Sequence, residues 1–181
     1  MTFTPQQKML IDLQSQWPPL FNKFVFVLDR RSGKTVMGME MVVNEIRRLR
    51  SGSVPPRNGR GISIAYMFFS EERARWGRNI LRDTIEPIFP IETKDHIKIE
   101  GIDSDGEPFP VSVYAESMKS NMFIGLDISL KVIDEMAGPL DWLQPNERAV
   151  AFRSVYDPDD RKPGVIIIDA QRQDILPSSL I

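Results

Sequence analysis

Short, continuous apolar runs alternate along the chain with segments whose apolar residues recur every three or four positions. The runs are rich in β-branched and aromatic residues, which is typical of strands that are buried on both faces. The spaced segments are typical of helices with one buried face. Strands are therefore predicted within residues 24–28, 62–70, 128–138 and 163–174, and helices within residues 6–16, 35–50, 71–89 and 146–158.

One segment has a different pattern. Residues 96–117 alternate between apolar and polar positions in two arms, and Asp103-Ser104-Asp105-Gly106 between the arms is typical of a turn. This pattern predicts a β-hairpin. Because the remaining strands alternate with helices, the sequence predicts an α/β fold with a mostly parallel central sheet that is flanked by helices, plus this hairpin.

A polar loop joins the first predicted strand to the next helix, and it carries Gly33, Lys34 and Thr35. Strand, Gly-Lys-Thr loop and helix follow one another as a phosphate-binding P-loop requires. The first N–H groups of the helix would attract phosphate, Lys34 would reach the β- and γ-phosphates, and the Thr35 hydroxyl would ligate Mg²⁺. Leu28 stands where the full motif has glycine, so a basic turn with a solvated lysine is an alternative.

Two adjacent acids, Asp134 and Glu135, follow the apolar run that begins at residue 128. Ligands of open α/β sheets bind at the carboxyl ends of the strands, where these acids are expected. An aspartate there can hold Mg²⁺, and a glutamate beside it can activate a water for hydrolysis. Together with the loop, the two acids predict a site that hydrolyses a nucleotide. Two solvated acids at a strand end are the alternative.

Composition narrows the function classes. The chain has 181 residues, a net charge of −2, no cysteine and one histidine, His96. A disulfide framework and a thiolate metal site are excluded, and no global basic field indicates nucleic acid. The sequence shows neither a signal-peptide pattern nor an apolar run of membrane-spanning length, so we expect no membrane association and a cytosolic protein.

Three segments in order resemble the ATPase domain of viral large terminases, the DNA-packaging motors of tailed bacteriophages. The segments are FVFVLDRRSGKT, ISIAYMFFSEERARWGRNIL and VSVYAESMKSNMFIGLDISLKVIDEMAG. The family often lacks the first P-loop glycine and has arginine before Gly-Lys-Thr, as at Leu28 and Arg30-Arg31. The resemblance extends over about residues 5 to 171 and implies an ASCE-type P-loop NTPase fold.

The resemblance implies further residue roles. Arg30 is expected to act as an arginine finger, with Arg31 as the neighbour to test against it, and Gln7 to read adenine. The family's coupling motif falls at Asp169-Ala170-Gln171, where a small hydroxyl residue is usual; here the Gln171 amide would sense a phosphate or water. The residues expected to bind ATP are Gln7, Arg30, Arg31, Ser32, Gly33, Lys34, Thr35 and Gln171. Thr35 and Asp134 are expected to hold Mg²⁺. The residues expected to be catalytic are Glu135, Arg30 and Lys34.

The resemblance also implies a function: ATP hydrolysis that powers translocation of double-stranded viral DNA into a procapsid. The implied partners are double-stranded DNA, a portal protein, a small terminase subunit and further copies in a pentameric ring, in the cytoplasm of an infected host cell. We expect residues 1–181 to form a single ATPase domain without the family's nuclease domain. A helicase- or recombinase-like ATPase acting on DNA and a non-catalytic assembly module are the alternatives.

Overall fold

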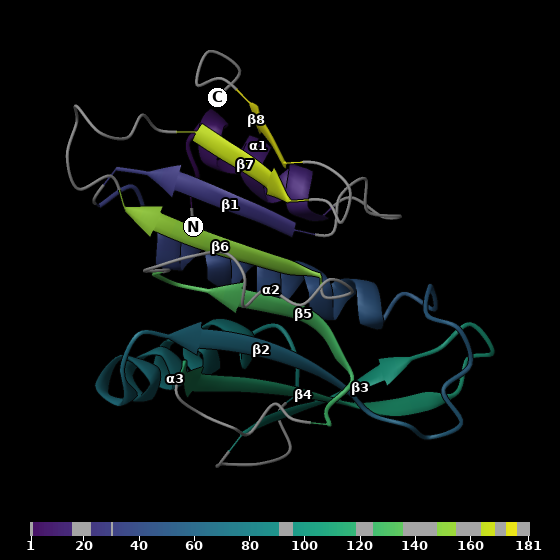
Figure 1. Cartoon of the computed structure of the whole chain (residues 1–181). Helices are drawn as coiled ribbons and strands as arrows, with labels where there is room; N and C mark the ends of the chain where they lie inside the picture. Colours follow the sequence, from purple (N-terminus) through teal and green to yellow (C-terminus); the bar gives the residue numbers. More distant parts are fainter. Residues whose placement is uncertain are drawn as a thin grey trace. The chain divides into compact units, whose positions relative to one another are not determined.

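The computed structural model describes residues 2–15, 23–29, 31–90, 96–118, 125–135, 148–154, 164–168 and 173–176. This part of the chain contains three helices and eight strands, joined by loops (Figure 1). The helices are α1 (Pro5–Ser15), α2 (Lys34–Leu49) and α3 (Glu71–Ile85). The strands are β1 (Lys23–Leu28), β2 (Ile62–Phe68), β3 (Ile97–Ile102), β4 (Pro108–Ser117), β5 (Ile128–Ile133), β6 (Ala149–Ser154), β7 (Gly164–Ile168) and β8 (Gln173–Leu176). Among these described residues, no helix has the length and apolar character needed to cross a membrane.

The chain divides into two compact units, and the first comprises residues 1–41 and 132–181. Its sheet is built on β1, all six residues of which are buried. Strand β6 pairs with β1 in parallel, so that Leu28 and Ser154 lie opposite each other at the carboxyl ends of the two strands. On the other side of β1, β7 is antiparallel, and β8 is antiparallel to β7. The parallel pair explains why both strands read as continuous apolar runs.

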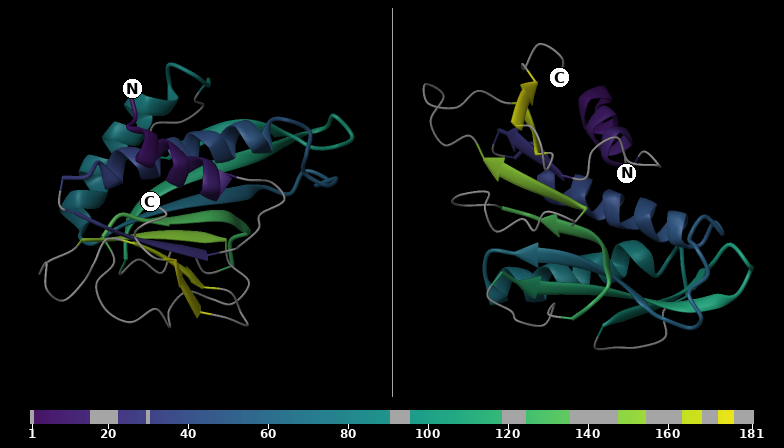
Figure 2. Two further views of the ribbon diagram at one scale, coloured as in Figure 1. Left: turned by 90° about the horizontal axis from the view of Figure 1, so that it is seen from above. Right: turned by 45° about the vertical axis from the view of Figure 1, so that its right-hand side comes forward.

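The second unit comprises residues 42–131. Strands β2 and β4 are parallel, β3 is antiparallel to β4, and β5 begins beside β2. Within this unit β2, β4 and β5 run in the same direction (Figure 1). Helix α3 packs on β4 and β2, and the right view in Figure 2 shows it beside these strands. The Ser70 hydroxyl accepts the N–H of Arg73 at 3.3 Å, so Ser70 caps the start of α3.

A glycine allows α3 to lie close to β2. Gly77 is on the buried side of α3, with Leu81 and Ile85. A Cβ atom added at Gly77 would lie 2.1 Å from Cζ of Phe68 and 2.3 Å from its Cε2, so the ring of Phe68 fills the space where a side chain would stand. A glycine inside a helix costs about 1 kcal/mol relative to alanine. Here that cost is offset by the close packing of helix and strand.

The predicted hairpin is confirmed, and a carboxylate organises its turn. Asp103 Oδ1 accepts the backbone N–H groups of Asp105 and Glu107, both at 3.0 Å, and Oδ2 accepts that of Arg57 at 2.9 Å. These bonds stabilise the ionised form and hold the pKa of Asp103 below its usual range, with the Arg57 bond contributing most and the Glu107 and Asp105 bonds next. Desolvation opposes the shift. The Asp103 carboxylate is therefore part of the hydrogen bonding of the turn.

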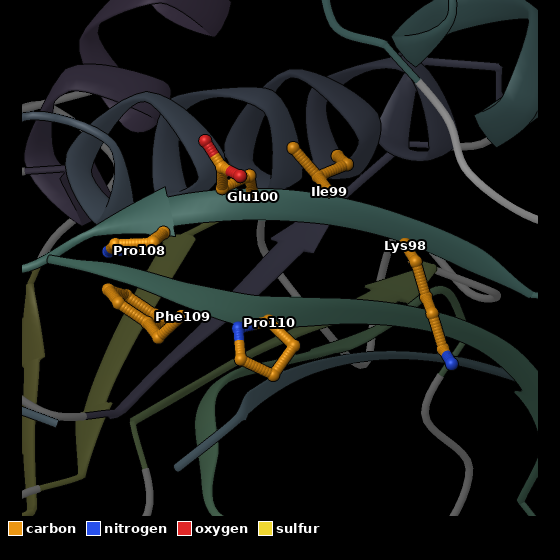
Figure 3. A pocket seen from close by; sticks show the side chains of 6 residues that line it. All are labelled: Lys98, Ile99, Glu100, Pro108, Phe109 and Pro110. Atoms are coloured by element: carbon orange, nitrogen blue, oxygen red, sulfur yellow. The ribbon is translucent and has the colours of Figure 1, made fainter. Parts of the chain in front are cut away.

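A pocket of about 210 Å³ lies on the same hairpin (Figure 3). It is lined by Lys98, Ile99, Glu100, Pro108, Phe109 and Pro110. None of these residues belongs to the site that the sequence predicts.

The strands and helices agree with the sequence prediction except near the C-terminal end. The helix predicted at residues 146–158 is wrong, because residues 149–154 form strand β6. Its apolar run of four residues is too short to show a period, and pairing with β1 decides its conformation. Strand β7 is where a last strand was expected, but it runs antiparallel to β1, and β8 was not predicted. The predicted fold class is confirmed: an α/β fold whose sheet is mostly parallel and flanked by helices.

Candidate active site

The loop between β1 and α2 is tightly folded. Arg31 and Gly33 have φ angles of 62° and 80°, both in the left-handed region, and the Ser32 N–H donates to the carbonyl of Asp29 at 3.3 Å. A left-handed conformation is costly for a residue with a Cβ, so Arg31 is held there by its surroundings. The predicted order of strand, loop and helix start is confirmed, with α2 beginning at Lys34.

Lys34 lies against the loop. Its side chain is buried, with 9% of the residue exposed, and Nζ donates to the carbonyl oxygen of Asp29 at 2.8 Å. The alternative of a basic turn with a solvated lysine does not describe this geometry. The ammonium lies across the same loop whose N–H groups begin α2, so a bound anion would meet both the positive charge and the helix N-terminus. Thr35 follows in the first turn of α2 and is half-buried.

Gln7 fastens helix α1 to this loop. Its Oε1 accepts the Thr4 N–H at 2.8 Å, and the Thr4 hydroxyl accepts the Gln7 N–H at 3.2 Å, which is a capping box. Its Nε2 donates to the carbonyl of Ser32 at 2.8 Å. A Cβ at Gly33 would lie 2.8 Å from the same Nε2, so Gly33 leaves room for the amide. These bonds use one donor and one acceptor of the amide, and a primary amide has two donors and two lone pairs.

The two acids follow β5 and reach the same edge as the loop. Glu135 Oε1 accepts the backbone N–H of Ser154, and Oε2 accepts its hydroxyl, both at 3.1 Å. Ser154 ends β6 and is paired with Leu28, which ends β1 and directly precedes the loop. Pairing and hydrogen bonds thus connect Leu28, Ser154 and Glu135 at one end of parallel strands. Asp134, half-buried, is the first residue after β5.

The loop contains a polar group that suits an anionic ligand. The Ser32 Oγ is buried and has no hydrogen-bond partner among the described residues. An unpaired buried hydroxyl is costly, and a phosphate oxygen could satisfy it. The donors of the loop therefore fit a phosphate, and the oxygens of Thr35 and Asp134 are of the kind that Mg²⁺ prefers.

Two predicted site residues, Arg30 and Gln171, lie outside the described residues, as do Asp169 and Ala170. The strand before Gln171 gives its assignment no support. Because β7 is antiparallel to β1, Ile167 near the end of β7 pairs with Phe24 near the start of β1, whereas the loop leaves the other end of β1.

Sequence reasoning missed Ser154. The signal available was a small hydroxyl residue directly after a short apolar run, in a segment that was predicted to be helical. Once the run is a strand beside β1, the serine lies at the edge where phosphate-binding loops and catalytic acids gather in α/β sheets.

Comparison with models of known protein families found no match, and comparison with curated proteins found none either. Among solved structures, the large terminase of bacteriophage HK97 is similar, with a TM-score of 0.57 and 18% identity. The match covers 85% of this chain and 33% of the terminase chain. This likeness, with the loop geometry, decides the fold. The chain has a P-loop NTPase fold.

A second solved structure is less similar to this chain than the terminase is. It is a Saccharomyces cerevisiae Dbp5 variant bound to a Gle1 variant and IP6, with a TM-score of 0.43, 14% identity, and a match over 87% of this chain and 42% of that one. A likeness at this level supports no further statement. The chain spans about a third of the length of the terminase structure.

Proposed function

We propose that this chain is a Mg²⁺-dependent ATPase and that it acts as the ATPase domain of a viral DNA-packaging motor. The observation that supports hydrolysis best is the contact path from Leu28 through Ser154 to Glu135, because it brings an acid to the end of the strand that carries the phosphate loop. A phosphate-binding loop alone would support only binding. A carboxylate beside it adds a group that can accept a proton from water.

The loop and Lys34 bind the phosphates in this proposal. Lys34 already donates to the loop carbonyl of Asp29, so it can turn to a phosphate oxygen without leaving the loop. The N–H groups at the start of α2 and the Ser32 hydroxyl donate further hydrogen bonds. These donors neutralise negative charge where it increases during phosphoryl transfer, which is the main catalytic effect in this reaction class.

Thr35 and Asp134 would hold Mg²⁺. Among the residues that the structure describes, no three His, Cys, Asp or Glu side chains gather as a metal site. Mg²⁺ at a nucleotide site takes one or two protein oxygens together with phosphate oxygens and water, so two protein ligands suffice. When bound, the ion supplies charge neutralisation on the β- and γ-phosphates.

The remaining assignments are part of the same proposal. Glu135 orients and deprotonates the attacking water, and Arg30 stabilises the charge of the transition state, with Arg31 as its alternative. Gln7 reads adenine with the donor and the lone pair that its bonds to Ser32 and Thr4 leave over. Gln171 is proposed to sense a phosphate or water.

The likeness to a large terminase supports the packaging motor, since the P-loop NTPase fold is shared with that protein. We propose residues 1–181 as one ATPase domain that acts on double-stranded DNA, with a portal protein, a small terminase subunit and further copies of the chain in a ring, in the host cytoplasm. DNA contact would come from local arginine patches, because the net charge is only −2.

Mg²⁺-dependent ATP turnover tests the proposal, measured beside nucleotide binding over a range of protein concentrations. We expect Glu135→Gln to lower kcat by about 10²–10⁴-fold with binding retained, because it removes a general base. We expect Lys34→Ala to lower kcat/KM by about 10²-fold or more, because it removes a phosphate contact. Glu72→Gln and Lys8→Ala, exposed residues of α3 and α1, are the matched controls and should match the wild type.

Other results would redirect the proposal. Full turnover of Glu135→Gln or Lys34→Ala would show that the site is misassigned. Binding without turnover at any concentration would favour a non-catalytic assembly module. Turnover stimulated by DNA but independent of a portal-bearing procapsid would favour a helicase- or recombinase-like ATPase.

A further inference from the structure

Ser154 contacts Glu135 through two different donors. Its backbone N–H donates to Oε1 and its hydroxyl to Oε2, each at 3.1 Å. A hydroxyl facing an ionised carboxylate can only donate, since the carboxylate has no proton to give. One residue thus engages both oxygens of the carboxylate, and the pair of bonds fixes the plane of the carboxylate as well as its position.

Ser154 is itself held rigidly. It is the last residue of β6, it is paired in register with Leu28 of β1, and only 4% of it is exposed. A glutamate side chain has three rotatable bonds and loses considerable entropy when it is ordered. Glu135 follows its strand by two residues, and its two bonds to Ser154 restrict these rotations. The end of β6 therefore provides a fixed point for a flexible acid.

We propose that Ser154 is the positioning residue for the water-activating carboxylate of Glu135. This inference rests on the proposed function and adds to it a residue outside both sequence motifs. Ser154 takes two of the roughly four acceptor positions of an ionised carboxylate, so the contact does not by itself use up the capacity to accept a proton. A base must lie within about 3 Å of the proton that it abstracts, and errors near 1 Å are costly in rate.

A mutation of Ser154 can remove its hydroxyl donor but not its backbone N–H donor. Ser154→Ala deletes the hydroxyl bond to Oε2 and leaves the backbone bond to Oε1, so the plane of the carboxylate is less firmly fixed. We expect kcat to fall roughly tenfold, a part of the effect of a positioned general base. We expect the KM for ATP to change by less than about twofold, because Ser154 contacts the acid and not the phosphate loop donors.

A double-mutant cycle separates positioning from a merely structural role. In a Glu135→Gln background, Ser154→Ala should cause no further loss of the residual single-turnover rate, since its effect acts through the carboxylate. Ser154→Thr keeps the hydroxyl and should restore most of kcat, whereas Ser154→Val should not. This pair differs only in hydroxyl against methyl, so it answers the question even if Ser154→Ala fails to fold. Ser112→Ala, at a half-buried serine of strand β4, is the control.

The outcomes separate this inference from the proposed function. If Glu135→Gln abolishes turnover while Ser154→Ala leaves kcat unchanged, the positioning role is wrong and the ATPase proposal stands. An equal loss from Ser154→Ala with and without Glu135, or a change in KM alone, would also overturn it. If Glu135→Gln turns over ATP at the wild-type rate, the proposed function itself fails, and this role fails with it.

Discussion

At the scale of single residues, side chains distant in sequence hold two parts of the candidate site, the loop after β1 and the Glu135 carboxylate. Gln7 reaches it from α1, and Ser154 holds Glu135 beside the strand that leads into it. Neither residue belongs to the Gly-Lys-Thr motif or the acid pair. A loop held by its surroundings keeps its donors oriented before a ligand arrives, which reduces the cost of ordering on binding.

The contacts of Gln7 with the loop predict how strongly two substitutions of this residue lower the stability of the fold. Gln7→Ala removes both the cap and the bond to Ser32, and we expect it to lower the free energy of unfolding by about 1–2 kcal/mol. Gln7→Glu keeps an acceptor for the Thr4 N–H but cannot donate to the Ser32 carbonyl, and it faces that oxygen with negative charge. We therefore expect Gln7→Glu to be at least as destabilising as Gln7→Ala.

Denaturant unfolding of the two variants measures this order. Exposed Lys8→Ala on the same helix is the control and should stay within about 0.5 kcal/mol of the wild type. A Gln7→Glu protein as stable as the wild type would mean that the cap alone matters and that the bond to the loop contributes nothing.

The sequence predicted the local order of strand, loop and helix at the candidate site and missed the long-range contacts. Gly33, Lys34 and Thr35 are adjacent, and their motif depends only on a strand before and a helix after. The bond between Glu135 and Ser154 depends on which strand pairs with β1, and this pairing cannot be read from a window of residues. The contact of Gln7 with Ser32 joins positions 25 apart and was equally invisible.

At the scale of elements, a helix or strand was predicted correctly where its apolar pattern was long and where its ends carried capping or turn residues. Helix α3 was predictable because Ser70 caps it and its apolar positions recur over four turns. Strand β6 was not, because its apolar run is compatible with a helix as well as a strand. The direction of β7 was also beyond the sequence, since a buried apolar strand has the same composition in either orientation.

The packing of α3 on β2 gives a prediction about one glycine. Gly77→Ala places a Cβ 2.1 Å from Cζ of Phe68, so the ring or the helix must move. We expect a net loss of about 1–3 kcal/mol of stability, because overpacking outweighs the gain of about 1 kcal/mol in helix propensity. Asn79→Ala, at an exposed position of the same helix, gains propensity without a clash and should be neutral or slightly stabilising.

Urea unfolding of both variants checks this prediction, with far-UV circular dichroism as the signal. If Gly77→Ala were as stable as Asn79→Ala, α3 would not lie as close to Phe68 as the structure has it.

At the scale of the whole molecule, acid stability depends on a carboxylate outside the candidate site, that of Asp103. The pKa of Asp103 is lowered by the N–H groups of Arg57, Glu107 and Asp105. A carboxyl whose pKa is lower in the folded state stabilises the fold above its unfolded pKa near 4 and loses this contribution as pH falls through the folded value. The loss is therefore expected below about pH 4.

We expect Asp103→Asn to lower the melting temperature near neutral pH, since an amide cannot accept all three N–H groups as a charged carboxylate does. The difference from the wild type should shrink as the pH falls below about 4. Melting temperatures of both proteins from pH 7 to pH 3 measure this. Asp105→Asn, an exposed acid of the same turn, is the control, and a constant difference at every pH would contradict the charge argument.

The separation of the site residues along the chain also has a consequence for protein synthesis. Glu135 and Ser154 leave the ribosome about a hundred residues after Lys34 and Thr35. At synthesis rates of roughly 5–20 residues per second, this interval lasts on the order of ten seconds. A nascent chain would therefore possess the loop after β1 before the Glu135 carboxylate and its serine partner exist. If the proposed ATPase function holds, hydrolysis requires that translation has passed residue 154, and unfinished chains would not consume ATP.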